Sequence, residues 1–150
     1  MEVISLFLKS LPKGSNIIVE EATYDRVVLD AEIYGHNLIG VELTPAGVNL
    51  DQLKEVVNKY SVAAFYGIPF HQNPTVINYS EENLKSVEQI CKDKGIFCAW
   101  DICYQALRYD GEKNIPIRVS DWGPVLINSN WYILFKKNIK IYVFLAGTLK

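Results

Sequence analysis

Residues 65–79 read FYGIPFHQNPTVINY, in which an apolar run leads into two prolines, a Gln-Asn pair and a threonine. The apolar residues 62–67 have the length and composition of a buried β-strand. Asn73, rigidly framed by Pro74 and Thr75, follows that strand in the chain. Loops that leave the carboxyl ends of strands are where α/β proteins bind ligands, so this loop is a first candidate for a functional site.

Outward from this stretch in both directions, short apolar runs alternate with helical patterns. We predict strands at residues 16–20, 37–43, 62–67, 96–100 and 125–128. We predict helices over residues 3–11, 23–34, 49–60 and 80–94. Strands separated by helices of this length form parallel βαβ units with right-handed crossovers. The predicted fold class is therefore α/β, with helices on both faces of a mostly parallel sheet.

Residues typical of helix boundaries flank the predicted helices. The expected N-caps are Thr23, Asn49 and Ser80, and Asn49 begins a capping box with Gln52. Glycines 35 and 95 stand where helices commonly end. The apolar face expected for the second helix consists of Val27, Val28, Ala31 and Tyr34.

Composition narrows the class of protein. The chain has 150 residues, of which 49% are hydrophobic and 21% charged, as expected for one globular domain. A formal net charge of −2 argues against a nucleic-acid partner. No apolar run approaches the ~20 residues of a membrane span, and the N-terminus does not read as a signal peptide. Three cysteines without a C-x-x-C motif predict small buried side chains in a reducing cytoplasm, with no disulfide framework and no zinc site.

Three polar or aromatic candidates stand at strand exits or at the helix starts that follow them. They are Tyr24, Asn73, and the pair Asp101 and Tyr104. Each has an ordinary structural interpretation as well, as a packing residue, a turn former or a strand-end cap. Their order and spacing along the chain are more informative than any one of them.

Four stretches carry a resemblance to a known family: NIIVEEATYDRVVLDAEIYG, TPAGVNLDQL, IPFHQNPTVINYS and GIFCAWDICYQALRYDG. Together they resemble the fold-type I pyridoxal 5'-phosphate enzymes, in particular class I/II aminotransferases of the aminoadipate and kynurenine branch. The resemblance covers roughly residues 3–112. It implies a partial large domain of this architecture over residues 1–128, with a divergent tail over residues 129–150. The family's homodimeric habit makes a homodimer one possible assembly.

The resemblance also implies roles for the candidate residues. Asp101 would accept a hydrogen bond from the pyridine nitrogen of the cofactor and keep that nitrogen protonated. A protonated ring is the better electron sink for the carbanion formed from an amino acid. Asn73 and Tyr104 would both hydrogen-bond the phenolic oxygen of the ring, and Tyr24 would stack on the ring face.

The chain departs from the family pattern at several positions. Ala22 replaces a common proline, and Val76 follows QNPT where the family usually has glycine, which is unfavourable if that position needs a positive φ. The position of the cofactor-binding lysine falls on Tyr132, while Lys136 and Lys137 come four and five residues later. The family's phosphate-binding turn and small C-terminal domain have no counterpart in the sequence.

Two functional expectations follow. The first is a pyridoxal-phosphate-binding domain that serves amino transfer between an amino acid and a 2-oxo acid but is inactive by itself. The second is a non-catalytic remnant, or one half of a split enzyme completed by a C-terminal half. A dinucleotide-binding domain is disfavoured because no G-x-G-x-x-G follows a strand. A response-regulator-like domain is disfavoured because no lysine follows Glu20 and Glu21 in the required context.

Overall fold

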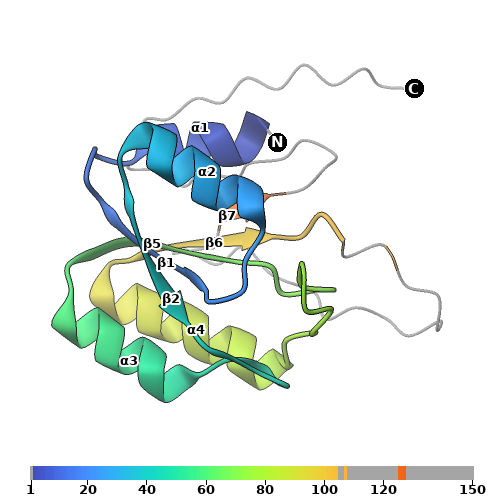
Figure 1. The fold of residues 1–150 in the computed structure, drawn as a ribbon. Coiled ribbons are helices and arrows are strands. Elements are labelled where there is room, and N and C mark those ends of the chain that lie inside the picture. The colour runs from blue at the N-terminus through green and yellow to red at the C-terminus, as the bar shows by residue number, and fades with distance from the viewer. Residues whose placement is uncertain (1, 105–106, 108–124, 128–150) are drawn as a thin grey trace.

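The computed structural model describes residues 2–104, 107 and 125–127 and contains the predicted alternation of strands and helices (Figure 1). All pairings in the main sheet are parallel, in the order β2-β1-β5-β6-β7. Its strands are β1 (Asn16–Glu20), β2 (Asn37–Val41), β5 (Val62–Gly67), β6 (Phe97–Asp101) and β7 (Val125–Ile127). A separate hairpin joins β3 (Leu43–Thr44) to β4 (Gly47–Val48). The tail predicted for residues 129–150 lies outside the described residues.

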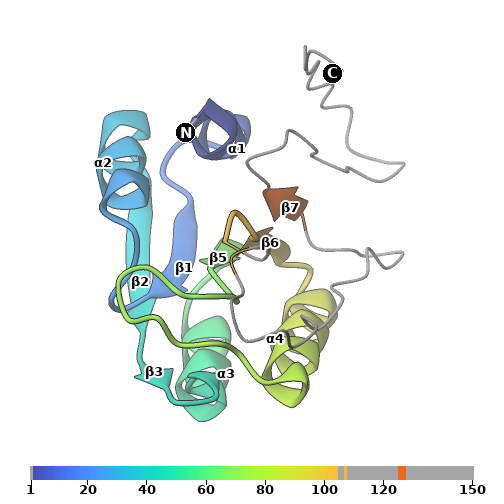
Figure 2. The same ribbon diagram turned by 90° about the vertical axis from the view of Figure 1, so that its right-hand side faces the viewer.

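Two helices cover each face of the sheet. Figures 1 and 2 show α1 (Glu2–Ser10) and α2 (Asp25–Tyr34) on one face, with α3 (Leu50–Lys59) and α4 (Glu81–Lys94) on the other. This arrangement confirms the predicted α/β class with helices on both faces of a parallel sheet. Within the part of the chain that the structure describes, no helix has the length and apolar character needed to cross a membrane.

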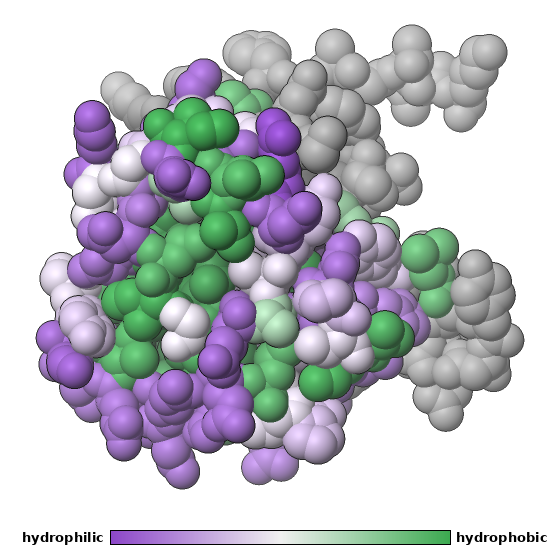
Figure 3. Space-filling model, in the orientation of Figure 1, coloured by the Kyte–Doolittle hydropathy of each residue, from purple (hydrophilic) through white to green (hydrophobic). Residues whose placement is uncertain are grey.

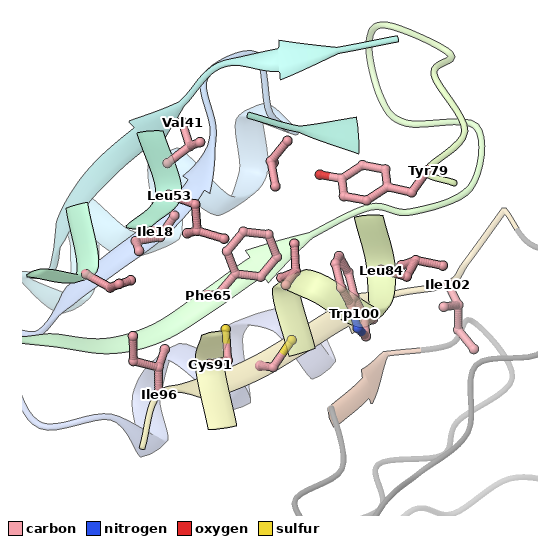
Figure 4. Packing of buried hydrophobic residues seen from close by; sticks show 14 of the residues in the cluster. Ile18, Val41, Leu53, Phe65, Tyr79, Leu84, Cys91, Ile96, Trp100 and Ile102 are labelled. Carbon is pink, nitrogen blue, oxygen red and sulfur yellow. The ribbon is translucent and has the colours of Figure 1, made fainter. Parts of the chain in front are cut away.

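The sheet separates two apolar clusters. The cluster under α3 and α4 contains Phe65, Tyr79 and Trp100 (Figure 4). The Trp100 ring meets the other two edge-on, with ring centroids 5.3 Å from Phe65 and 5.5 Å from Tyr79. The second cluster lies under α1 and α2 and is built around Phe7, Val27 and other apolar side chains. Because the inner strands are covered on both faces, their sequences are nearly continuous apolar runs.

Several predicted helix boundaries are confirmed. The Asn49 side chain accepts hydrogen bonds from the backbone N–H groups of Asp51 and Gln52, and Ser80 accepts one from Asn83. Gly35 and Gly95 end α2 and α4 in the left-handed conformation that glycine adopts without strain. These local signals are readable from sequence because each cap satisfies backbone groups only two or three residues away.

Three details differ from the prediction. The N-cap of α2 is Tyr24 rather than Thr23, and its side chain makes no capping hydrogen bond. Gln52 accepts from the backbone N–H of Glu42 instead of closing a capping box on Asn49. The strand predicted over residues 37–43 ends at Val41, because the following residues turn away to form the β3–β4 hairpin.

The outward face of α2 is more apolar than expected. Val28, predicted to face the core, is 45% exposed, beside the exposed side chains of Leu29 and Ile33. Figure 3 shows apolar residues gathered over α2 and β2. The inner face of α2 instead holds Asp30, which pairs with Arg26 at 3.1 Å and accepts a hydrogen bond from Ser5. The buried residues of α2 are Val27, Asp30 and Ala31, so the buried face includes this carboxylate and excludes Val28.

The segment between β5 and α4 is closed by its own hydrogen bonds. The Tyr79 N–H donates to Pro69 O at 2.9 Å, and the Gln72 N–H donates to Ile77 O at 3.0 Å. The Gln72 O accepts from the Val76 N–H at 2.6 Å. The peptide bond between Asn73 and Pro74 is cis. The hydrogen bonds make residues 68–79, called here the Asn73 loop, a compact unit.

A buried carboxylate joins the Asn73 loop to the sheet. Glu20, the last residue of β1, has no exposed surface. Its Oε1 accepts hydrogen bonds from the Ile68 N–H at 2.9 Å and from the Tyr79 hydroxyl at 2.7 Å, and its Oε2 accepts from Gln72 Nε2 at 2.7 Å. Burial raises the pKa of Glu20 to about 7, although the three donors act in the opposite direction.

We expect the substitution Val76→Gly to stabilise the protein. Val76 has φ 62° and is 67% exposed, so the valine has the strained conformation and little packing to lose. Relief of a left-handed conformation stabilises the protein by about 1–2 kcal/mol. The extra conformational freedom of glycine in the unfolded chain reduces this gain by about 0.4–1 kcal/mol. Urea unfolding should therefore show a gain of about 1 kcal/mol in the free energy of unfolding.

The control for this change is Val28→Gly on the exposed face of α2, where the same substitution should lower the free energy of unfolding because glycine is a poor helix former. A loss of stability for Val76→Gly would show that the valine side chain contributes more than its backbone conformation costs.

We also expect stability to fall with rising pH through the titration of Glu20. The unfolded chain releases this proton near pH 4.5, whereas the native chain holds it until about pH 7. The contribution is therefore fully present below pH 4.5 and is lost as the pH rises through about 7, a change of about 3 kcal/mol. Urea unfolding of Glu20→Gln across this window should lack that fall, and the exposed control Glu21→Gln should retain it.

Candidate functional site

The sequence-predicted site residues lie at the carboxyl edge of the sheet. Tyr24 follows β1, Asn73 follows β5, Asp101 ends β6, and Tyr104 follows it. Because β1, β5 and β6 are parallel neighbours, the segments that leave them emerge on the same side (Figure 1). The topology thus brings to one edge residues that are far apart in the chain.

Asn73 and Tyr104 lie side by side at this edge. The Asn73 amide Nδ2 donates to the Tyr104 hydroxyl at 3.3 Å, and both side chains are only partly buried. The bond joins the loop after β5 to the loop after β6. Two hydrogen-bonding groups are therefore presented together on a surface that remains accessible.

Asp101 is the buried acid of the site. The residue is 4% exposed, its Oδ2 accepts from the Tyr66 hydroxyl at 2.8 Å, and its Oδ1 accepts from the Cys103 N–H at 3.1 Å. Burial, followed by the nearby Asp101 charge, raises the pKa of Tyr66 well above its usual value, so Tyr66 stays protonated as a donor. An ionised carboxylate has about four acceptor positions, so Asp101 retains capacity for a further donor.

Tyr24 occupies the start of α2. Its ring is partly buried against the apolar cluster under α1 and α2, and Tyr104 packs against the same cluster. Among the described residues, neither Tyr24 nor Asp101 has a hydrogen bond to the pair of Asn73 and Tyr104. The four residues share one edge, and only two of them are in direct polar contact.

Two buried polar atoms at this edge have no hydrogen-bond partner within the described part of the chain. They are Thr23 Oγ1, next to Tyr24, and His71 Nε2, next to Gln72. Buried polar groups are usually satisfied in a completed structure. Buried polar atoms without a partner also occur elsewhere in the described part of the chain, at His36 and Asn83.

The sequence reasoning missed the residues that support the site. Glu20 and Gln72 connect β1 to the Asn73 loop, and Tyr66 donates to Asp101. The available signals were an acid at the end of a buried strand and a glutamine directly before Asn73. A buried charge at a strand end calls for donors, which is the inference that would have found Gln72 and Tyr79.

No lysine stands in the described segments that leave β1, β5 and β6 at this edge, residues 21–24, 68–80, 102–104 and 107. The position predicted for the cofactor-binding lysine, Tyr132, lies outside the described residues. So do Lys136 and Lys137.

Known aminotransferases match this chain in sequence and in fold. Aromatic-amino-acid aminotransferase 1 of Thermococcus litoralis is 28% identical over 113 residues, covering 72% of this chain and 27% of that protein. LysN, an α-aminoadipate aminotransferase of Thermus thermophilus, was crystallised with N-(5'-phosphopyridoxyl)-L-leucine and is 27% identical with a TM-score of 0.71, covering 77% of this chain and 30% of LysN. An archaeal alanine:glyoxylate aminotransferase is 26% identical with a TM-score of 0.71, covering 75% and 29%.

The chain spans less than a third of the length of each of these relatives. The family model described as aspartate amino-transferase matches residues 11–120, which is more than half of the chain and includes all four candidate residues. The protein therefore belongs to the aspartate amino-transferase family, the fold-type I, class I/II aminotransferases that use pyridoxal phosphate.

Proposed function

We propose that this chain forms the ring-facing part of a pyridoxal-phosphate site and that the reaction it serves is amino transfer between an amino acid and a 2-oxo acid. The observation that carries the proposal is the pair of Asn73 and Tyr104, whose polar atoms lie 3.3 Å apart. Two groups that share one hydrogen bond can also converge on one acceptor. The phenolic oxygen of the cofactor ring is such an acceptor.

The residues present fit the cofactor ring. Asp101 is buried, holds two donors and has acceptor capacity left for the pyridine nitrogen. The orphaned Thr23 hydroxyl indicates that the edge beside Tyr24 is incomplete without another group. When bound, pyridoxal phosphate supplies an electron sink for the carbanion of the amino acid.

Each proposed residue has a separate task. Asp101 keeps the pyridine nitrogen protonated by placing a negative charge beside it. Asn73 and Tyr104 hold the phenolic oxygen and so orient the ring in its plane. Tyr24 covers one ring face and limits the approach of water to it. These tasks bind and orient the cofactor but do not by themselves transfer a proton from the amino acid.

A specific observation favours a second candidate, a non-catalytic chain. The described segments at the carboxyl edge hold no lysine, and the aligned position in the tail is Tyr132. A tyrosine cannot take the covalent role of a lysine amine. Such a chain is either a remnant or one half of a split enzyme, completed by a separate C-terminal half.

A trapping experiment tests whether the chain keeps a lysine that captures the cofactor covalently. The purified chain is mixed with pyridoxal phosphate, reduced with borohydride and digested for mass spectrometry. We expect no stoichiometric adduct on one lysine, because no lysine occupies the aligned position. A single stoichiometric adduct on Lys136 or Lys137 would contradict this and would identify a catalytically equipped site with a shifted register.

Ring recognition itself is tested by Asp101→Asn. A charge-assisted hydrogen bond contributes about 1.5–3 kcal/mol, so equilibrium dialysis should show pyridoxal phosphate bound about 10- to 100-fold more weakly. The control Asp93→Asn changes the same charge at the last turn of α4, near the amino end of the sheet, and should leave binding unchanged. Equal binding by the wild type and both variants would refute the assignment of Asp101.

A further inference from the structure

One carboxylate contacts the start, the middle and the end of the Asn73 loop. Glu20 Oε1 accepts from the Ile68 N–H and the Tyr79 hydroxyl, and Glu20 Oε2 accepts from Gln72 Nε2. The loop residues in these contacts are 48 to 59 positions from Glu20 in the chain. No other described side chain bonds to all three parts of the loop.

Gln72 transmits this contact to the turn that carries Asn73. Its Nε2 also donates to Ala22 O at 2.6 Å, while its Oε1 accepts from the Thr75 N–H at 2.8 Å and the Thr75 hydroxyl at 2.5 Å. The nitrogen and the oxygen of this side-chain amide therefore each have their own partners. Asn73 lies between Gln72 and Thr75, inside the turn that the amide closes.

From these contacts we infer that Glu20 is a positioning residue, which holds the preformed Asn73 loop in the place where the Asn73 amide meets Tyr104. The loop keeps its shape through its own hydrogen bonds, and the contacts with Glu20 determine the position of the loop relative to the sheet. The importance of this loop position for cofactor binding rests on the function proposed above. The position of the loop itself does not depend on that proposal.

Only an ionised carboxylate accepts hydrogen bonds on both oxygens, so the arrangement of three donors around Glu20 is complete above its pKa of about 7. A glutamine at position 20 could accept on one side only, so its amide N–H would face either Gln72 Nε2 or the donors Ile68 and Tyr79. Gln72 cannot turn to accommodate it, because its oxygen is held by Thr75 and its nitrogen by Ala22. The amide variant therefore loses the contact between β1 and Gln72 while keeping nearly the same volume.

The test uses nuclear magnetic resonance on the whole chain without cofactor. In Glu20→Gln we expect the Asn73 side-chain amide signal to shift, while the Ile68 amide, which still has the glutamine oxygen as its acceptor, keeps its hydrogen-exchange protection. The internally bonded amides of Val76 and Tyr79 should keep wild-type protection. A Glu20→Gln chain in which the Asn73 signal is unchanged would overturn the inference.

Two controls separate positioning from general damage. Glu21→Gln makes the same change at the exposed neighbouring residue and should leave the Asn73 signal in place. In the double variant Glu20→Gln with Gln72→Glu, an amide donor at position 20 again faces a carboxylate acceptor at position 72. The Asn73 signal should therefore return part of the way to its wild-type position. The return is only partial because Ala22 O loses the donor that Gln72 provided. Loss of protection at Val76 and Tyr79 in Glu20→Gln would show that the loop has unfolded, and would contradict a positioning role.

The wild-type chain gives a test that needs no variant to fold. Protonation of Glu20 adds a hydrogen to the group that faces Gln72, so the Asn73 amide signal should move together with the carboxyl carbon signal of Glu20 in one pH titration. The other titratable groups facing Glu20 are Asp101, whose carboxyl carbon is followed separately, and the buried Tyr66 and Tyr79, which stay neutral in this range. An Asn73 signal that does not follow Glu20 would refute the inference, whatever the outcome of the cofactor-binding experiments.

Discussion

The interaction on which the candidate site depends is the bond between the Glu20 carboxylate and three donors of the Asn73 loop. Removing a charge from water is costly unless hydrogen bonds replace its hydration. The loop supplies three donors, from Ile68, Gln72 and Tyr79, which offset part of this cost, and burial still raises the pKa of Glu20 to about 7. Consequently the end of β1 and the loop after β5 form one unit, although two helices and a hairpin separate them in the chain.

Three levels of structure then combine at the carboxyl edge. Parallel pairing of β1, β5 and β6 brings their exits to the same side, which positions Asp101 directly as a strand residue. The loop's backbone bonds determine its internal shape. The Glu20 contacts determine its place, and only then does the Asn73 amide lie within reach of Tyr104.

Much of the fold could be predicted because its signals are local or periodic. The strands at 16–20 and 62–67 coincide with the prediction, since burial on both faces makes them unbroken apolar runs. The prediction for Val28 was wrong because the buried Asp30 counts as a polar position in any periodicity analysis. Glu20 and Gln72 were missed for the same reason, since a charged side chain whose partners lie about 50 positions away carries no local sign of burial.

The candidate residues were identified by their positions at strand exits, and their roles came from a resemblance. Among the described residues, the hydrogen bonds of the Asn73, Asp101 and Tyr104 side chains are made with one another and with Tyr66 and Cys103, while Asp101 also pairs with Ile127 in the sheet. Under the proposed function, recognition of the cofactor ring and its covalent capture would reside in different parts of the sequence, because Asn73, Asp101 and Tyr104 precede residue 105 whereas the aligned lysine position is Tyr132.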